Sequence, residues 1–222
     1  MNDHFWFPIK LSLQVATIAV IIVLILALMI AHIMVENSFP GKSIIETIFI
    51  MPLVLPPTVV GFLLIVIFGR NHFIGQWIET LFGQQIMFTW WAALLASIVV
   101  AFPLIYQSIK TGFLAVDPSI QDAARQSGAN ELQVLFYITI PLASKAIIAG
   151  IILSFSRALG EFGATLMFAG NIPGKTQTLP IAIYMAMDAG NMKMAWLWVI
   201  STIIISFLML YTVSTIKENH HA

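Results

Sequence analysis

Two short segments end like a phosphate-binding loop, because each places Gly-Lys before a hydroxyl residue. They are GNIPGKT at residues 170–176 and FPGKS at residues 39–43. A nucleotide-binding loop needs the spacing G-x-x-x-x-G-K-[ST] on a turn between a strand and a helix. The first required glycine would be Ala169 in one segment and Glu36 in the other, so neither segment has the pattern. We interpret both as polar turns in which glycine relieves backbone strain, and we do not expect the chain to bind ATP.

A charged pair inside one long apolar stretch is the second candidate for chemistry. Arg157 and Glu161 are four residues apart, which is about one turn of a helix. Ionisable groups in such a stretch pair with each other or face a cavity, so an internal ion pair and a functional site both remain open. A catalytic site would need further convergent groups, and none accompanies the pair in the sequence. The 5 histidines lack metal-ligand spacing and cysteine is absent, so no metal, cofactor or catalytic residue is expected.

The composition indicates a polytopic membrane protein. Hydrophobic residues make up 59% of the 222 residues and charged residues 9%, against roughly 25% charged in soluble domains. Lys plus Arg and Asp plus Glu each number 10, so no net field favours nucleic acid as a partner. Only helices and closed barrels satisfy their backbone hydrogen bonds in lipid. The apolar runs are continuous instead of alternating, so the predicted fold class is all-α, a polytopic helical membrane protein.

Five stretches are long enough to cross a bilayer as helices. A helix needs about 20 mostly apolar residues to cross a hydrocarbon core of ~30 Å. We therefore expect a transmembrane domain over residues 11–216, preceded by a segment at 1–10 and followed by a tail at 217–222. The predicted spans are residues 11–33, 44–68, 89–109, 146–168 and 194–216.

Proline and glycine residues mark two irregular places within these spans. Pro52, Pro56 and Pro57 interrupt the second span, because proline removes a backbone donor and kinks a helix. The kink either serves packing or gives a bent helix that lines a central cavity, and both interpretations stay open. In the fourth span, Gly160 and Gly163 allow close helix contact or local unwinding, of which we expect close contact.

Two connections are predicted to carry short helices of their own. In residues 71–88 the apolar side chains recur at helical spacing, which indicates a short amphipathic helix. This helix lies either at the membrane interface or over the end of the bundle. Residues 171–193 contain LPIAIYMAM, which is too short to span and is predicted to form a short external or re-entrant helix.

The longest polar connection, residues 110–145, is predicted to form two short helices with a glycine bend between them. Asp117 before Pro118 provides an N-cap and a preset first helical residue. Gly128 supplies a position where left-handed backbone is permitted. The first helix is too short to be stable alone in water, so it lies against its own bundle or against a partner. One face of it carries small residues that let another surface approach closely, with the members Ile120, Ala123, Ala124 and Ser127.

The second short helix has start and stop signals as well. Asn130 and Gln133 have the spacing of a capping box, in which each side chain accepts a hydrogen bond from the other residue's backbone N–H. Pro141 limits how far this helix runs, because the residue before a proline is disfavoured in helical conformation.

At this connection the sequence resembles a known family. DAARQSGANELQVLFYITIP, residues 122–141, resembles the coupling-loop signature of bacterial ABC importer permeases. That signature is an acidic residue, Ala-Ala, three residues, Gly, nine residues and Ile-x-Leu-Pro. Asp122 stands where the family more often has Glu, and Ile140 stands where it has Leu. The matching positions are Asp122, Ala123, Ala124, Gly128, Ile138 and Pro141.

Two further stretches are similar to molybdate importer permeases. They are SRALGEFGATLMFAGNIPGKTQTLPIAIY at residues 156–184, and FPGKS followed by MPLVLPPTVVGFLL. Sulfate and tungstate permeases share parts of this pattern, including Gly-Glu-Phe-Gly, so they are the alternative. The similarity covers essentially the whole chain and implies the type I ABC importer permease fold, with a cytoplasmic coupling helix.

The resemblance implies a division of labour among subunits. A separate ATPase dimer would use ATP and Mg, and two copies of this chain would form the pathway in the bacterial cytoplasmic membrane. The N-terminus would lie outside and the C-terminus inside. An extracytoplasmic oxyanion-binding protein would dock near Arg70, Lys175 and Lys193, and Arg157 would act on the field felt by the anion or serve only structure. The residues expected to couple to the ATPase are Asp117, Ile120, Asp122, Ala123, Ala124, Gly128, Ile138 and Pro141.

Overall fold

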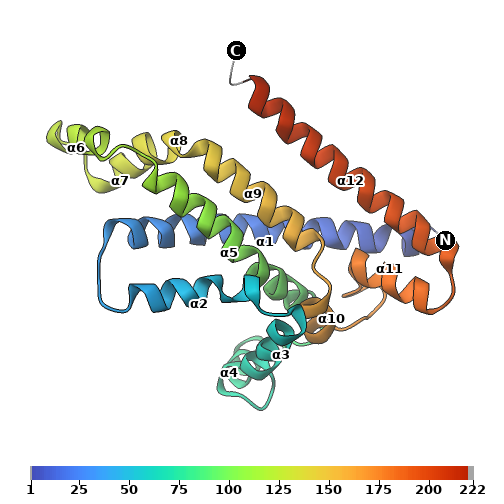
Figure 1. Cartoon of the computed structure of the whole chain (residues 1–222). Coiled ribbons are helices and arrows are strands. Elements are labelled where there is room, and N and C mark those ends of the chain that lie inside the picture. Colours follow the sequence, from blue (N-terminus) through green and yellow to red (C-terminus); the bar gives the residue numbers. More distant parts are fainter. Residues whose placement is uncertain (1, 220–222) are drawn as a thin grey trace.

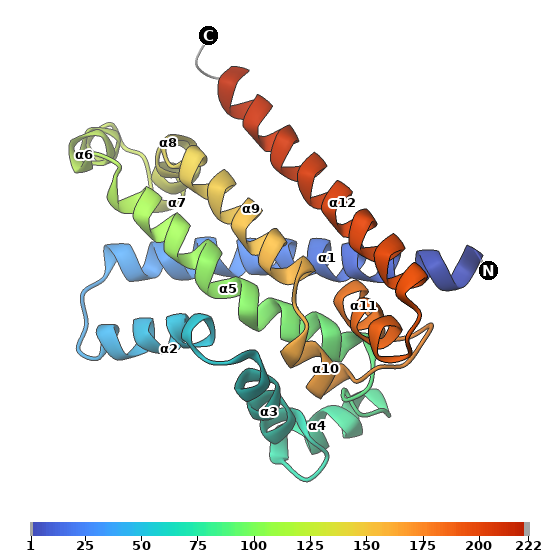
Figure 2. The ribbon, with the colours of Figure 1, turned by 45° about the vertical axis from the view of Figure 1, so that its right-hand side comes forward.

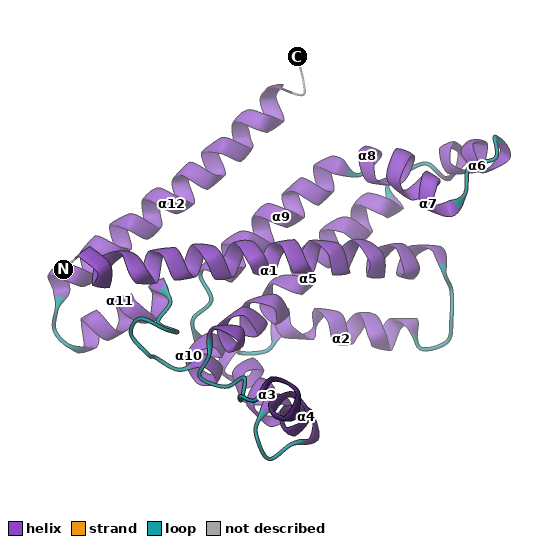
Figure 3. Ribbon diagram, turned by 180° about the vertical axis from the view of Figure 1, so that it is seen from behind, coloured by secondary structure: helices purple, strands orange, loops and turns teal. Residues whose placement is uncertain are grey.

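The computed structural model describes residues 2–219, and every regular element within that range is a helix (Figure 3). Met1 and residues 220–222, the end of the predicted tail, lie outside the described residues. The helices are α1 (Asn2–Glu36), α2 (Lys42–Val54), α3 (Pro57–Phe68), α4 (Phe73–Phe82), α5 (Trp90–Leu114), α6 (Pro118–Gln126), α7 (Glu131–Val134), the π-helix η1 (Leu135–Thr139), α8 (Ile140–Leu142), α9 (Ser144–Leu159), α10 (Gly163–Ala169), α11 (Leu179–Asp188) and α12 (Met192–Asn219).

Up to five segments of the described chain are long and apolar enough to cross a membrane. Three of them are single helices, namely His4–Glu36, Trp90–Leu114 and Met192–Met209. The other two are pairs of helices with a sharp bend between them. The predicted first, third and last spans therefore correspond to α1, α5 and α12. One bent pair, Lys42–Val54 with Pro57–Phe68, covers the predicted second span. The other, Glu131–Leu142 with Ser144–Leu159, covers only part of the predicted fourth span, residues 146–168.

The second predicted span, residues 44–68, is interrupted, as its prolines predicted. Its two halves, α2 and α3, meet at an angle of 119°. Leu55 is extended, with ψ of 142°, because the ring of Pro56 disfavours helical backbone at the preceding residue. Pro57 then occupies the first turn of α3, where its missing N–H costs nothing. Pro52 stays inside α2, so only the Pro56–Pro57 pair produces the break.

The fourth predicted span, residues 146–168, contains a break as well. Helix α9 ends at Leu159 and α10 begins at Gly163. Gly160 lies at the end of α9 and takes part in local unwinding, which is the outcome we did not expect. Gly163 does make the expected close contact, because a Cβ there would lie 2.8 Å from Cβ of Pro57.

Three helices, α1, α5 and α9, form the main core, and small residues allow their close approach. Four alanines of α1 are fully buried: Ala16, Ala19, Ala27 and Ala31. A Cβ at Gly150 of α9 would lie 2.7 Å from Cβ of Ser108 on α5, so only glycine fits at this crossing. The Ser154 hydroxyl donates to the Ala101 carbonyl at 3.0 Å and adds an interhelical hydrogen bond, as in other membrane bundles.

The last helix, α12, diverges from this core. It begins against α11 near the N-terminal end of α1 and then runs away from α9 (Figures 1 and 2). Only 11% of its span Met192–Met209 is buried. The described part of the chain therefore leaves most of the apolar side chains of α12 uncovered.

Two of the polar connections lie at opposite ends of the molecule, and the one that carries α4 lies apart from both (Figure 1). Helices α6, α7 and α8 lie together at one end, and the N-terminus and α11 lie at the other (Figure 1). The two predicted short helices of the other connections are present as α4 and α11. The apolar face of α4 is largely uncovered, with Trp77 61% and Phe82 72% exposed, so α4 is not packed over the bundle end by that face.

Candidate coupling and translocation sites

The first short helix of the polar connection, α6, forms with the predicted caps. The Asp117 carboxylate accepts a hydrogen bond from the Ser119 backbone N–H at 2.9 Å, and this bond lowers the pKa of Asp117. Pro118 occupies the first turn. Gly128 has φ of 92°, which is left-handed backbone that glycine adopts without a Cβ penalty. The ends of α6 are therefore set by its own sequence.

The small-residue face of α6 is open. Ile120 is 46% exposed, and Ala123 and Ser127 are exposed as well. Ala124 is half-buried, whereas Gln121 on another face is buried. In the described residues this face does not contact the chain's own bundle, which was one of the two alternatives. The face remains available for another surface.

The second short helix, α7, begins with the predicted capping box. Asn130 accepts from the Gln133 backbone N–H at 2.9 Å, and Gln133 accepts from the Asn130 backbone N–H at 2.8 Å. The helix continues as the π-helix η1 and ends at Leu142, one residue beyond Pro141. Pro141 cannot donate to the turn before it. The segment Glu131–Leu142 then meets α9 at 74°, and Ile138 lies half-buried within it.

A cluster of ion pairs around Arg125 was not expected from the sequence. Its guanidinium donates to Asp122 on α6, to Glu131 on α7 and to Glu36 at the end of α1. Asp122 is three residues before Arg125, a spacing that a helix brings together and that could have signalled the first contact. Glu36 is 89 residues away, and no local sequence pattern predicts its contact with Arg125.

The charged pair of the fourth span is also assembled. Arg157 donates to Glu161 at 2.6 Å, and the side chains are 28% and 1% exposed. The other carboxylate oxygen of Glu161 accepts from the Ala164 backbone N–H at 2.8 Å. Glu161 thus holds Arg157 with one oxygen and the first turn of α10 with the other, a capping role that sequence reasoning missed.

The break in the fourth span lies beside the break in the second. Pro57, at the start of α3, is within contact distance of the position that a Cβ of Gly163 would occupy. Helices α3 and α10 pack against each other. The structure therefore brings together the Pro56–Pro57 bend and the segment that follows Glu161. Pro52 takes no part in this junction, because it lies within α2.

Of the three basic residues expected to dock a binding protein, Arg70 and Lys175 lie in different connections and Lys193 lies in the first turn of α12. Arg70, in the turn before α4, pairs with Glu79 at 3.2 Å and is 72% exposed. Lys175 and Lys193 are exposed. Lys175 follows Gly174, whose φ is 74°, in a turn closed by the buried Thr176, which accepts from the Ile172 backbone N–H at 3.1 Å. The left-handed glycines here and at Gly41 confirm that both GK segments are glycine turns.

A second interhelical ion pair was missed by sequence reasoning. Lys110 of α5 donates to Glu46 of α2 at 2.7 Å, and both side chains are about one-fifth exposed. Phe49 packs edge-on against Phe102 and Tyr106 beside this pair. These contacts attach α2, which has no fully buried residue, to the core helix α5.

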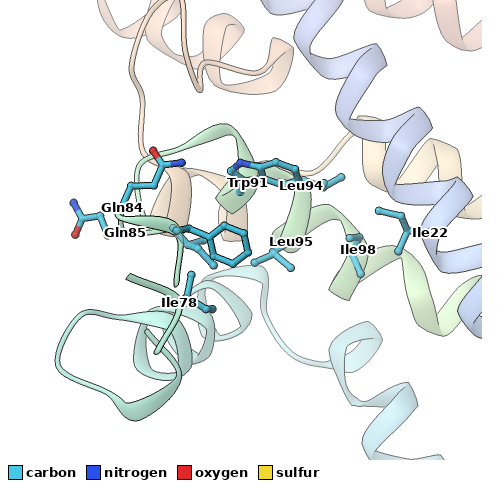
Figure 4. Close-up of a pocket in the computed structure, with 10 residues that line it drawn as sticks. Ile22, Ile78, Gln84, Gln85, Trp91, Leu94, Leu95 and Ile98 are labelled. Atoms are coloured by element: carbon cyan, nitrogen blue, oxygen red, sulfur yellow. The ribbon is translucent and has the colours of Figure 1, made fainter. Parts of the chain in front are cut away.

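A pocket of about 350 Å³ lies between α1, α4 and α5 (Figure 4). None of its lining residues is charged, and its polar members, Gln84 and Gln85, lie on the side away from Ile22. Such a pocket offers a small anion no positive charge, and its amide donors lie at one side only (Figure 4). Among residues whose side chains are described, no group of three or more metal-ligating residues gathers.

Comparison with known proteins identifies close relatives. The family model described as binding-protein-dependent transport system inner membrane component matches residues 23–216. The chain is 58% identical to YvgM of Bacillus subtilis, named as a molybdenum transport system permease protein, over 98% of this chain and 96% of that protein. It is 44% identical to the molybdenum transport system permease protein ModB of Escherichia coli K12, over 83% and 80%. It is 30% identical to the sulfate transport system permease protein CysT of Salmonella typhimurium, over 94% and 75%.

Solved structures of low identity share the fold. A bacterial ABC transporter that imports the polysaccharide alginate superposes with a TM-score of 0.79 at 12% identity, covering 99% of this chain and 80% of that chain. The methionine ABC transporter MetNI, in an inward-facing conformation, gives a TM-score of 0.70 at 14% identity, covering 97% of both chains. At these identities the likeness concerns the arrangement of helices, which is that of type I ABC importer permeases.

Proposed function

Because the chain belongs to the family of binding-protein-dependent transport system inner membrane components, we propose that it is the transmembrane permease subunit of an ATP-driven molybdate importer. The observation that supports molybdate as the substrate is the ranking of the relatives by sequence identity. Two proteins named as molybdenum permeases are 58% and 44% identical to it, whereas the sulfate permease is 30% identical. Sulfate, and tungstate with it, is therefore the second candidate.

The energy source of this importer is a separate ATPase subunit that binds α6. The open face of α6 carries Ala123 and Ala124, whose small side chains permit close approach of a groove on that subunit. Closure of an ATPase dimer around ATP and Mg would move α6, and through it the spans. Such movement requires that the lever make different contacts in the two states of the ATPase.

The orientation in the membrane follows from the place of α6. With α6 in the cytoplasm, the N-terminal end of α1 lies outside, because the two lie at opposite ends of the molecule (Figure 1). A second copy of this chain and the surrounding lipid then cover α12, whose exposed apolar side chains include Ile203 and Phe207. The pathway forms between the two copies.

Reconstitution tests the cargo and the partner together. The chain, co-expressed with its ATPase and binding-protein subunits, is expected to co-purify with the ATPase and to take up radiolabelled molybdate in proteoliposomes only with internal ATP. Competition by sulfate should need a much higher concentration than competition by molybdate, since the relatives rank in that order. The measurement is the initial rate of uptake with each competing anion.

Two results would contradict this assignment. Uptake of sulfate in preference to molybdate would indicate that the chain is the permease of a sulfate importer. Uptake of anion without any ATPase subunit would instead indicate a channel and remove the coupling role of α6. A matched control is a nonhydrolysable ATP analogue, which binds the ATPase and does not support repeated cycles.

Replacing the outer basic residues should weaken docking of the binding protein. The triple change Arg70→Ser, Lys175→Ser and Lys193→Ser removes three exposed charges, each worth about 0.2–1 kcal/mol in an interface rim. The expected loss is about tenfold in affinity. It is measured as binding of molybdate-loaded binding protein to the permease complex in nanodiscs at two salt concentrations. Lys42→Ser, at the start of α2 and at the same end of the molecule as α6 (Figure 1), is the control. Unchanged affinity in the triple variant would place docking elsewhere.

A further inference from the structure

We propose that Arg125 is a positioning residue that fastens the α6 lever to the inner end of α1, so that movement of α6 is delivered to the three-helix core. The inference rests on the proposed function above, because a lever matters only in a subunit driven from outside. It assigns a role to Arg125, Glu36 and Glu131.

The guanidinium of Arg125 binds three carboxylates, one from each of three helices. Nε and Nη2 of Arg125 donate to the two oxygens of Glu131 at 2.9 and 3.0 Å. Nη1 donates to Asp122 at 3.0 Å, and Nη2 lies 3.4 Å from Glu36. Every nitrogen of the guanidinium thus has a carboxylate partner. Contact with Glu131 raises the pKa of Arg125 and lowers that of Glu131, so both groups stay charged at neutral pH.

Helix α6 needs such a fastening because it has little else to hold it. It is nine residues long, which is too short to be stable alone, and Gln121 is its one buried residue. Its packing within the chain is mainly against α7 and η1. The apolar face that could have attached it to the bundle is the open face with Ile120 and Ala123. Arg125 joins this helix to α1 through Glu36.

Glu36 is well placed to receive the movement. It is the last residue of α1, and α1 packs against both α5 and α9. A helix packed on two others transmits displacement of its end as a rigid body. By contrast, the covalent route from α6 to α9 passes through the Gly128 bend, the π-helix and a 74° bend. The Arg125–Glu36 contact therefore adds a direct connection to α1, beside the short covalent link from α6 back to α5 through residues 115–117.

An arginine is required at this position in preference to a lysine. The planar guanidinium offers five donors in a fixed geometry, whereas a lysine ammonium is a single point charge on a flexible stem. A lysine can approach one of the three carboxylates at a time. The side chains of Arg125 and Glu36 are 29% and 35% exposed, and those of Asp122 and Glu131 are 62% and 58% exposed. Water screens each of these pairs, so the fixed geometry that joins three carboxylates matters more than any single pair.

Distance measurements between two spin labels test the fastening directly. The chain has no cysteine, so Ser38→Cys, just beyond α1, and Gln126→Cys, on α6, give one labelled pair in each copy, and mixing with an excess of unlabelled chain leaves one such pair in a complex. Both positions are exposed. In nanodiscs without nucleotide we expect one narrow distance distribution. Arg125→Gln and Glu36→Gln should each broaden it, whereas Lys145→Gln, which removes an exposed charge at the start of α9, should not.

Transport measurements test the consequence. With Arg125→Gln or Glu36→Gln, the ATPase subunit should still co-purify, because the open face of α6 is unchanged. The molybdate taken up for each ATP hydrolysed should fall about fivefold or more, which is the usual size of a coupling between two sites. Arg125→Lys should give an intermediate ratio. A purely structural role would instead lower the amount of assembled complex and leave this ratio unchanged.

Unchanged distances together with an unchanged ratio in both variants would overturn the proposal. Broadened distances with an unchanged ratio would overturn it too, since the fastening would then have no part in transport. Failure of the proposed function is seen separately, in the unsubstituted complex, as lack of ATPase binding or of molybdate uptake. In that case the label distances still decide whether Arg125 fastens α6 to α1.

Discussion

Ala123→Arg is expected to abolish ATP-driven molybdate uptake and to release the ATPase subunit. Ala123 lies on the open face of α6 and is exposed, so a partner groove can approach its backbone closely. An arginine would hold that groove away or bury an unpaired charge, which costs about 3–5 kcal/mol. This corresponds to a loss of at least about 100-fold in affinity. Co-purification of the ATPase subunit and uptake in proteoliposomes measure the two effects.

The matched control carries the same substitution on another face of the same helix. Gln126→Arg adds the same side chain at an exposed position that does not belong to the small-residue face, and it should leave ATPase binding near that of the unsubstituted chain. Ala124→Arg should act in the same direction as Ala123→Arg. If Ala123→Arg kept both association and uptake, force would have to enter the bundle elsewhere, and the lever role of α6 would be abandoned.

Glu161→Ala is expected to prevent stable assembly of the permease. The carboxylate is 1% exposed and holds both Arg157 and the Ala164 backbone N–H. Its removal leaves a charge and a backbone donor without partners, at a cost of about 3 kcal/mol, the lower end for a buried pair because Arg157 is partly exposed. The measurement is the melting temperature of the purified complex, together with the fraction that elutes as a single species.

A double variant separates the structural role of this pair from an effect on the anion. Arg157→Gln with Glu161→Gln keeps an acceptor for the Ala164 N–H and leaves no unpaired charge. We expect this variant to restore assembly and uptake, because the geometry is that of an internal ion pair and helix cap. Restored assembly with uptake still about tenfold lower would contradict that view, and would indicate that Arg157 stabilises the passing anion by its charge.

The polar connection of residues 110–145, which carries α6 and α7, shows how far local sequence determines structure. Its caps are formed as predicted at Asp117, Gly128 and the Asn130–Gln133 box. Each of these features depends on hydrogen bonds and dihedral preferences within about four residues, which the chain specifies wherever it is placed. The same holds for the glycine turns at the two GK segments.

The interrupted spans show where this local reasoning reached its limit. Hydropathy located apolar segments of the right length, and the prolines marked the weak point of the second one. Neither could give the bend of 119° or the end of α9 at Leu159. These depend on the other helices that satisfy the freed backbone groups. Gly163, for example, accommodates Pro57 of a segment about a hundred residues earlier in the chain.

Composition, hydropathy and the coupling motif, read from the sequence alone, determined the all-α membrane class and the place of the lever helix. Only the tertiary structure decided which charges meet: Arg125 with Glu36, and Lys110 with Glu46, which are 89 and 64 residues apart. The physical reason is the range of the forces involved. Capping and backbone preference act between neighbours in the chain, whereas ion pairing and close packing act between neighbours in space, and those are defined only once the helices have assembled.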